Sequence, residues 1–127
     1  MKVLLVIALG MGTAAAGARP GAEAASGGVV RAAEVQDTAG KAIFLGKGMC
    51  QACHGPEAKG TSLAPDLTDK EWLHADGTVE TIAKVVKEGV AAPKKHPAPM
   101  PAMGGAQLTD AEIQAVARYI VSLSPKP

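Results

Sequence analysis

Residues 48–55 have the sequence GMCQACHG and contain both cysteines of the 127-residue chain, Cys50 and Cys53, followed directly by His54. Two cysteines separated by two residues occur in thiol redox proteins, in zinc sites and at points where a larger group is attached covalently. The three uses need different surroundings. The rest of the chain therefore decides what this motif does.

Two of these uses, and a plain disulfide, fit poorly. A thioredoxin-like redox pair would open a helix behind a β-strand, and no strand pattern precedes Cys50. A structural zinc site needs four ligands in a closed tetrahedron, whereas the motif offers three, of which Cys53 and His54 are adjacent. A disulfide across two intervening residues would close a very small loop and add little stability.

The full pattern Cys-x-x-Cys-His is typical of c-type haem attachment. Two thiols one helical turn apart can each add to a vinyl group of one porphyrin, and the imidazole of His54 can then be the fifth ligand of the iron. The chain has only one Phe, one Trp and one Tyr, although aromatic side chains usually supply much of a core. A haem would fill that space, so we predict one haem c bound covalently through Cys50 and Cys53.

The N-terminus has the three parts of a secretory signal peptide. Lys2 precedes an apolar run over residues 3–9, and small residues with Ala-x-Ala patterns follow, one of them at 16–18. The run is shorter than the about 20 apolar residues of a spanning helix. We therefore expect residues 1–18 to be removed on export to the periplasm or another exported location, without stable membrane insertion; an uncleaved anchor is the alternative.

Removal of residues 1–18 lowers the formal net charge from +1 to about zero. A near-neutral domain lacks the basic face that nucleic-acid binding requires, so we expect no nucleic-acid partner. The remaining length suits one small domain, which we expect to be a monomer.

Composition divides the remaining chain into a leader and a domain. Residues 19–36 are rich in alanine and glycine with little periodicity, which indicates a flexible leader ahead of a domain at 37–124. The domain should open with a short helix that begins at Asp37 or Thr38 and ends at about Gly46.

Two further helices are predicted. The apolar residues of 78–88 lie on one helical face, and Gly89 can end that helix. Thr109 and Glu112 form a capping box ahead of a helix that ends near Leu123.

The segments between these helices are predicted to be loops. Residues 55–77 carry turn residues, and four prolines within 91–105 exclude a regular helix. No segment alternates apolar and polar residues as a β-strand does. We therefore predict a small all-α fold of about three to five helices, with long loops around one covalent haem.

The sixth position of the iron has four candidate ligands: Met100, Met103, His74 and His96. The two histidines are more typical of solvated loop residues. Met100 lies between prolines, which hold a loop on a set path at low entropic cost. A His/Met ligand pair raises the reduction potential and leaves no position for a substrate, which favours electron transfer over catalysis.

From residue 40 to residue 123 the sequence resembles the class I monohaem cytochromes c, a family of small all-α proteins. The stretch APDLT resembles the Pro-x-Leu loop of that family. The resemblance implies that the carbonyl of Pro65 accepts a hydrogen bond from the imidazole of His54 and that Leu67 contacts the haem.

Two other stretches carry the resemblance. MPAMGG resembles the Met-Pro loop, which implies Met100 as the iron ligand, with Met103 as the alternative. TDKEWLHADG resembles cytochrome c domains that serve haem-copper terminal oxidases, which implies that Trp72 donates its indole N–H to a haem propionate; an ordinary half-buried tryptophan is the alternative. The resemblance also implies that Tyr119 packs near Phe44.

The resemblance implies a one-electron carrier and not an enzyme. Its partners would be redox proteins such as a terminal oxidase, a cytochrome bc-type complex or a periplasmic dehydrogenase. The alternatives are a haem enzyme or gas sensor with a displaceable sixth ligand, and a fixed subunit of a respiratory complex. Lys47, Lys59, Lys94 and Lys95 could form a positive docking face, or they could be ordinary solvated lysines.

Overall fold

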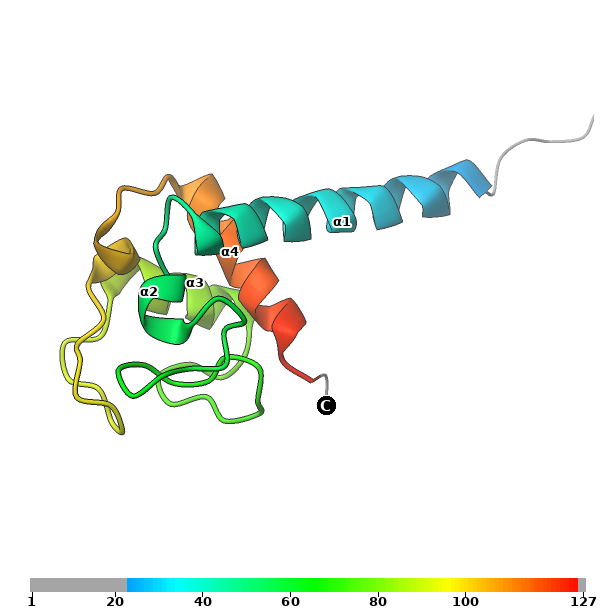
Figure 1. Cartoon of the computed structure of the whole chain (residues 1–127). Helices are drawn as coiled ribbons and strands as arrows, with labels where there is room; N and C mark the ends of the chain where they lie inside the picture. The colour runs from blue at the N-terminus through cyan, green and yellow to red at the C-terminus, as the bar shows by residue number, and fades with distance from the viewer. Residues whose placement is uncertain (1–22, 126–127) are drawn as a thin grey trace, which may run out of the picture.

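Helices and long loops make up the part of the chain that the computed structural model describes, which is residues 23–125 without the side chains of 23–31 and 33. Within that part there is one isolated backbone bridge and no β-strand. The elements in chain order are α1 (Glu23–Leu45), α2 (Gln51–His54), α3 (Val79–Glu88), the 3₁₀ turn η1 (Ala102–Gly105) and α4 (Asp110–Leu123) (Figure 1). The predicted all-α fold is confirmed.

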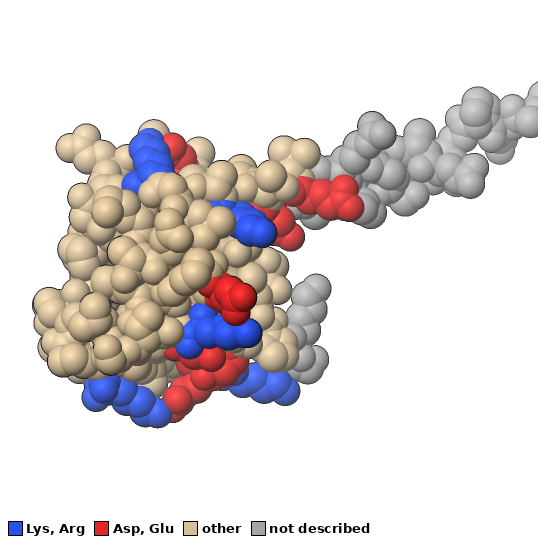
Figure 2. Space-filling view, in the orientation of Figure 1, with Lys and Arg blue, Asp and Glu red and all other residues tan. Residues whose placement is uncertain are grey.

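Long loops on one side of the helices form one face of the domain. In Figure 1 the loops that follow α2 and α3 hang below and to the left of the helices. Figure 2, in the same orientation, shows charged side chains at the top, along the bottom and on the right of the visible face, and an uncharged area in its left middle. Among the described residues, no helix combines the length and the apolar character that crossing a bilayer requires. The predicted signal peptide, residues 1–18, lies outside the described residues.

The helix α1 begins well before the predicted start. We expected an irregular leader over 19–36 and a helix from Asp37 or Thr38, but residues 23–36 already belong to α1. The hydroxyl of Thr38 donates to the carbonyl of Glu34 at 2.8 Å, a bond of the helix interior and not a cap. Alanine has the highest helix propensity, so an alanine-rich segment can extend a helix that is anchored by packing at its other end.

The anchored end of α1 crosses α4 at close range (Figure 1). Gly40 is buried at the crossing, where an added Cβ would lie 2.3 Å from the carbonyl oxygen of Ala115 and 2.5 Å from the Cβ of Tyr119. One turn further along α1, Phe44 is fully buried and meets Tyr119 edge to face, with 5.7 Å between ring centroids. The predicted contact between these two aromatic rings is confirmed.

The helices α3 and α4 each bury one apolar face, as their sequence periodicity predicted. The buried residues of this shared core are Ile82, Ala83 and Val86 of α3 and Ile113, Val116, Ala117, Tyr119 and Ile120 of α4. At the end of α3, Gly89 takes a φ of 73° and donates its N–H to the carbonyl of Val85 at 2.8 Å. The prediction that this helix ends at Gly89 is therefore confirmed.

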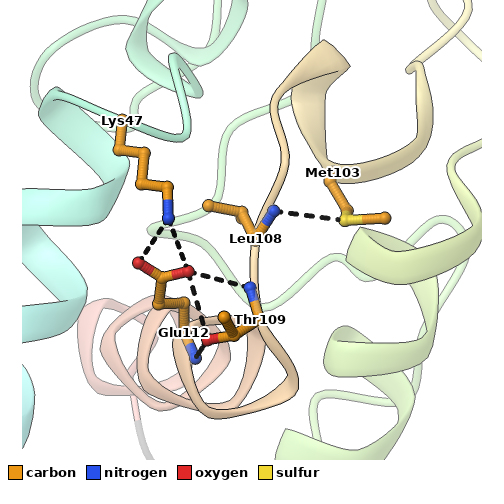
Figure 3. A network of polar contacts seen from close by, with 5 residues as sticks. All are labelled: Lys47, Met103, Leu108, Thr109 and Glu112. Carbon is orange, nitrogen blue, oxygen red and sulfur yellow. Dashed lines mark hydrogen bonds and ion pairs between the residues drawn. The ribbon is translucent and has the colours of Figure 1, made fainter.

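The predicted capping box of α4 also ties this helix to the loop ahead of the cysteine motif. The N–H of Thr109 donates to the carboxylate of Glu112 at 2.8 Å, and the N–H of Glu112 donates to the hydroxyl of Thr109 at 3.2 Å. The ammonium of Lys47 contacts both oxygens of the same carboxylate, at 2.7 and 2.8 Å (Figure 3). Lys47 lies just after the end of α1, so this pair links the ends of the two crossing helices.

The start of α3 provides a pH-dependent contribution to stability. The Asp76 carboxylate accepts hydrogen bonds from the Thr81 hydroxyl and from the N–H and hydroxyl of Thr78, the latter two at 2.9 and 2.7 Å. Chiefly because of the Thr81 hydroxyl, the pKa of Asp76 falls from its ordinary 3.8 to about 2. A carboxyl whose pKa is lowered by folding stabilises the protein above its unfolded pKa, and this contribution is lost as the pH falls through the folded pKa.

We expect Asp76→Asn to melt about a few degrees below the wild type at neutral pH, because the substitution weakens the helix cap. The difference should shrink as the pH falls from about 4 to about 2, and thermal unfolding followed by circular dichroism measures it. Asp69→Asn is the matched control, because that carboxylate accepts a single backbone hydrogen bond, from Glu71 at 2.8 Å. A constant difference over this pH range would contradict the prediction.

Candidate haem site

The cysteine motif forms a single helical turn. In α2 the N–H of His54 donates to the carbonyl of Cys50 at 3.0 Å, and Gly55 donates to Gln51 at 2.9 Å. Both cysteines are half-buried free thiols, so no disulfide joins them. Burial raises the pKa of the Cys50 thiol. The turn brings both thiols and the imidazole to the wall of the same cavity.

A hydrogen bond to a backbone carbonyl holds the imidazole of His54 in one orientation. Its Nδ1 lies 2.9 Å from the carbonyl oxygen of Pro65, which can only accept, so Nδ1 carries the hydrogen and Nε2 keeps a lone pair. Burial lowers the pKa of His54 and favours the neutral imidazole, which is the form that binds a metal. The predicted contact between His54 and Pro65 is therefore present, in an arrangement typical of metal-binding histidines.

Two hydrogen bonds hold the loop after α2 against the cysteine motif. Gly60 donates to the carbonyl of His54 at 2.8 Å, and the hydroxyl of Thr61 donates to the carbonyl of Cys53 at 2.6 Å. Gly60 has a φ of 78°, and an added Cβ would lie 2.6 Å from the nitrogen of Asp66. The glycine thus lets the loop fold tightly enough to place Pro65 beside the imidazole.

The cavity opens to solvent between the long loops and the helices. Its empty space measures about 1290 Å³ with the open mouth included. Most of its wall is apolar and comes from four parts of the chain: α2, the loop over 63–75, α3 and the segment over 90–104. Two thiols, one neutral imidazole and apolar walls fit a covalently attached haem.

The two candidate methionines occupy different environments. Met100 lines the cavity, and its backbone forms a two-way bridge with Val90, at 2.8 and 2.9 Å. Met103 does not line the cavity, and its sulfur accepts the N–H of Leu108 at 3.4 Å (Figure 3). The sequence left both methionines open as sixth ligand, and only Met100 lies on the wall that carries His54.

The seven residues that the sequence assigned to the haem site all lie on the wall of this one cavity. They are Cys50, Cys53, His54, Pro65, Leu67, Trp72 and Met100. The helical face of α3, with Ile82, Val85 and Val86, completes the wall. Periodicity assigned this face to the core but did not show that part of it faces a ligand.

Two histidines that were expected to be solvated loop residues also line the cavity. His74 and His96 are both half-buried. The Nε2 of His74 accepts the N–H of Lys94 at 3.3 Å, and the ammonium of Lys95 pairs with the carboxylate of Glu71. These two contacts fold the proline-rich loop back onto the 69–77 segment, and no signal in the local sequence predicts that.

Comparisons with known proteins agree with this chemistry. A family model described as "Cytochrome C oxidase, cbb3-type, subunit III" matches residues 35–120. Subunit CcoP of the cbb3-type cytochrome c oxidase of Rhodobacter capsulatus is 37% identical over 94 residues, which are 70% of this chain and 31% of that protein. Subunit FixP from Bradyrhizobium sp. strain ORS 278 is 40% identical over 91 residues, 69% of this chain and 30% of that protein.

The likeness covers one part of longer proteins. Subunit CcoP of Rubrivivax gelatinosus is 37% identical over 78 residues, which are 61% of this chain and 23% of that protein. The chain thus spans less than a third of the length of these curated relatives. No solved structure matches it. The family match and the cavity together show that the chain belongs to the cytochrome c family described as subunit III of cbb3-type oxidases, with haem c bound covalently through Cys50 and Cys53.

Proposed function

We propose that this domain is a one-electron carrier, not an enzyme, with His54 and Met100 as the two axial ligands of the haem. The observation that carries the proposal is that these residues come from distant segments, line one cavity and are each held by hydrogen bonds to or from the backbone. When bound, haem c supplies an iron that gains and loses one electron between the ferric and ferrous states. Rigid ligands suit this role because little rearrangement then accompanies electron transfer.

The roles of the chain's own residues follow from their positions. The carbonyl of Pro65 orients the imidazole of His54, and Leu67, which lines the cavity from the same loop, would contact the haem. The bridge between Val90 and Met100 sets the position of the thioether. A soft thioether opposite an imidazole favours the ferrous state and raises the reduction potential relative to two histidines.

Trp72 lines the haem cavity together with its chain neighbours Glu71 and Leu73. Its indole N–H has no hydrogen-bond partner among the described residues, and His74 and His96 line the same cavity. Glu71, Leu73 and His96 also line a polar depression, whose other charged residues are Lys59, Lys95, Asp66 and Asp69. The two propionates are the charged groups of a haem and need donors when they leave water. We therefore assign the propionates to this end, with Trp72 as one donor.

A haem enzyme or gas sensor with a displaceable sixth ligand is the rival function. It would require a mobile loop or two methionines that exchange at the iron. The bridge of Met100 to Val90 and the engaged sulfur of Met103 both argue against such exchange. A fixed protein ligand on each side of the iron leaves no position for a substrate or gas.

We expect Met100→Ala to lose the methionine–iron absorption band at the red end of the ferric spectrum and to lower the reduction potential. Its reduced form should bind carbon monoxide rapidly, because the sixth position is then open. Met103→Leu is the matched control and should keep the band and resist carbon monoxide. If Met103→Leu lost the band and Met100→Ala kept it, the ligand assignment would be wrong. Rapid carbon monoxide binding by the wild type would favour the sensor.

The partner proposed for this carrier is a haem-copper terminal oxidase of the cbb3 type, since the relatives are subunits of such oxidases. A cytochrome bc-type complex or a periplasmic dehydrogenase would be the electron donor. The pattern of residues 1–18 supports export to the periplasm. The N-terminal residue of the purified holoprotein, found by mass spectrometry, tests the export: an intact Met1 would contradict cleavage.

A further inference from the structure

The segment that carries Met100 ends in a turn with an uncommon backbone, and we call residues 99–105 the methionine loop. Met103, Gly104 and Gly105 have φ values of 54°, 67° and 85°. Three successive residues therefore have a positive φ, which glycine adopts freely and other residues adopt at a cost. The N–H of Gly104 donates to the carbonyl of Pro101 at 3.0 Å, so the backbone of the loop itself closes the turn.

Gly104 brings this turn directly against the segment that leads into the cysteine motif. A Cβ at Gly104 would lie 2.5 Å from the carbonyl oxygen of Gly48, which precedes Cys50 by two residues. Gly48 is buried, and its N–H donates to the carbonyl of Ile43 at 2.8 Å, at the end of α1. The oxygen thus belongs to a backbone segment that is fixed to a helix and has little freedom to move aside.

A second close contact joins the methionine loop to the end of α3. A Cβ at Gly89 would lie 2.5 Å from the carbonyl oxygen of Met100 and 2.7 Å from the nitrogen of Ala102. Gly89 has a φ of 73° and a ψ of −172°, a combination that is essentially restricted to glycine. The bridge between Val90 and Met100 starts at the next residue. The backbone of the loop therefore lies against the C-terminus of α3.

Gly105 shows that a glycine with positive φ in this turn can lie free of close contacts. It is exposed, and the nearest atom that a Cβ would meet is the Cγ of Pro101, at 3.8 Å. Gly104 and Gly105 are thus neighbours with a positive φ that differ in the space around them. The requirement for glycine at position 104 comes from the contact with Gly48 as well as from the turn.

We infer that Gly104 and Gly89 are positioning residues for the sixth ligand of the iron, because each lets a fixed backbone segment lie directly against the loop that carries Met100. This inference rests on the proposed ligation by His54 and Met100. The segment ahead of the cysteine motif and the methionine loop meet backbone to backbone, so no change of side-chain rotamer can relax their spacing. A Cβ at either glycine must displace the loop and, with it, the thioether.

Added imidazole measures how firmly the methionine loop is held. In the ferric protein its nitrogen would replace the thioether of Met100: one sulfur–iron bond breaks, one nitrogen–iron bond forms, and the oxidation state does not change. The apparent affinity for imidazole rises with the fraction of molecules in which the loop is open. A titration followed by the loss of the methionine–iron absorption band gives this affinity.

We expect Gly104→Asn to bind imidazole about tenfold or more tightly than the wild type, because overpacking against the carbonyl of Gly48 favours the open loop. Gly105→Asn is the matched control. Asparagine enters the left-handed region at a lower cost than most residues, so the two variants differ mainly in the contact. The imidazole affinity of Gly105→Asn should stay within about twofold of the wild type.

A purely structural role for Gly104 would give a different result. Gly104→Asn would then melt at a lower temperature than the wild type but bind imidazole no more tightly than Gly105→Asn, and this outcome would overturn the inference. Gly89→Ala tests the same loop from α3, also in the event that Gly104→Asn does not fold. It should bind imidazole about tenfold more tightly as well, and an affinity equal to that of the wild type would overturn the role of Gly89.

Met100→Ala separates failure of this inference from failure of the proposed ligation. It should bind imidazole more tightly than any of the glycine variants, because no thioether competes for the iron. If Met100→Ala and the wild type bind imidazole equally, Met100 is not the ligand and the proposed ligation fails. If Met100→Ala binds more tightly but Gly104→Asn behaves like Gly105→Asn, the ligation stands and the positioning role of Gly104 fails.

Discussion

Replacing Cys50 and Cys53 together by serine is expected to leave the protein without covalently bound haem and without a stable fold at physiological temperature. The cavity behind these thiols has an empty space of about 1290 Å³, open mouth included, and mostly apolar walls. Without the haem those walls would be in contact with water, and loss of buried apolar area costs about 25 cal/mol for each Å². The remaining core contains two buried aromatic rings, Phe44 and Tyr119.

The measurement is the mass of the purified protein together with its thermal unfolding. The wild type should carry the mass of one haem under denaturing conditions, and the double variant should carry none. Ala92→Ser is a suitable control, because it adds a serine at an exposed position away from the cavity wall. A double variant that retained the haem mass and the wild-type melting temperature would contradict covalent attachment at this motif.

The second large effect is expected at the helix crossing, where Gly40→Ala should destabilise the folded protein. Helix propensity alone predicts the opposite sign, since alanine is favoured over glycine by about 1 kcal/mol inside a helix. At Gly40, however, a Cβ would lie 2.3 Å from the carbonyl oxygen of Ala115 and 2.5 Å from the Cβ of Tyr119. Neither atom is the far end of a flexible side chain, so the helices themselves must separate.

Overpacking of this kind typically costs about 1–3 kcal/mol. At so short a distance we take the upper end, and subtracting the gain of about 1 kcal/mol from helix propensity leaves an expected net loss of about 2 kcal/mol in the free energy of unfolding. Chemical denaturation of the holoprotein measures the loss. Ala39→Val is the matched control, because it enlarges the exposed neighbour of Gly40 on the same helix and should change stability by less than about 0.5 kcal/mol. A Gly40→Ala variant more stable than the wild type would show that the crossing has room for a methyl group.

Local signals in the sequence predicted the elements whose physical cause is local. The capping box of Thr109 and Glu112 and the glycine stop after α3 each depend on a few neighbouring residues, and both are present. The start of α1 was predicted wrongly. Asp37 and Thr38 look like a cap in sequence, but the helix is stabilised by its crossing with α4 and extends through the alanine-rich segment before them.

Surface properties were harder to predict than the site. The sequence left open whether four lysines near the motif form a positive face or are ordinary solvated side chains. The acidic partners of Lys47 and Lys95 lie 65 and 24 residues away in the chain, so no local pattern shows that these two are ion-paired. The sequence did not show that His74 and His96 line the cavity, for the same reason. Their positions depend on the proline-rich loop folding onto the 69–77 segment, which is a long-range contact.

The sequence by itself indicated the chemistry of this protein, because Cys-x-x-Cys-His places two thiols and an imidazole within a single helical turn, and the rest of the chain lacks the strand pattern that a thiol redox pair would need. It also determined the helical class through the periodicity of its apolar residues. Only the tertiary structure decided which methionine lies on the cavity wall, and which lysines near the motif are ion-paired. Those properties arise where segments far apart in the chain meet: Met100 is positioned by Val90, and Lys47 is neutralised by Glu112.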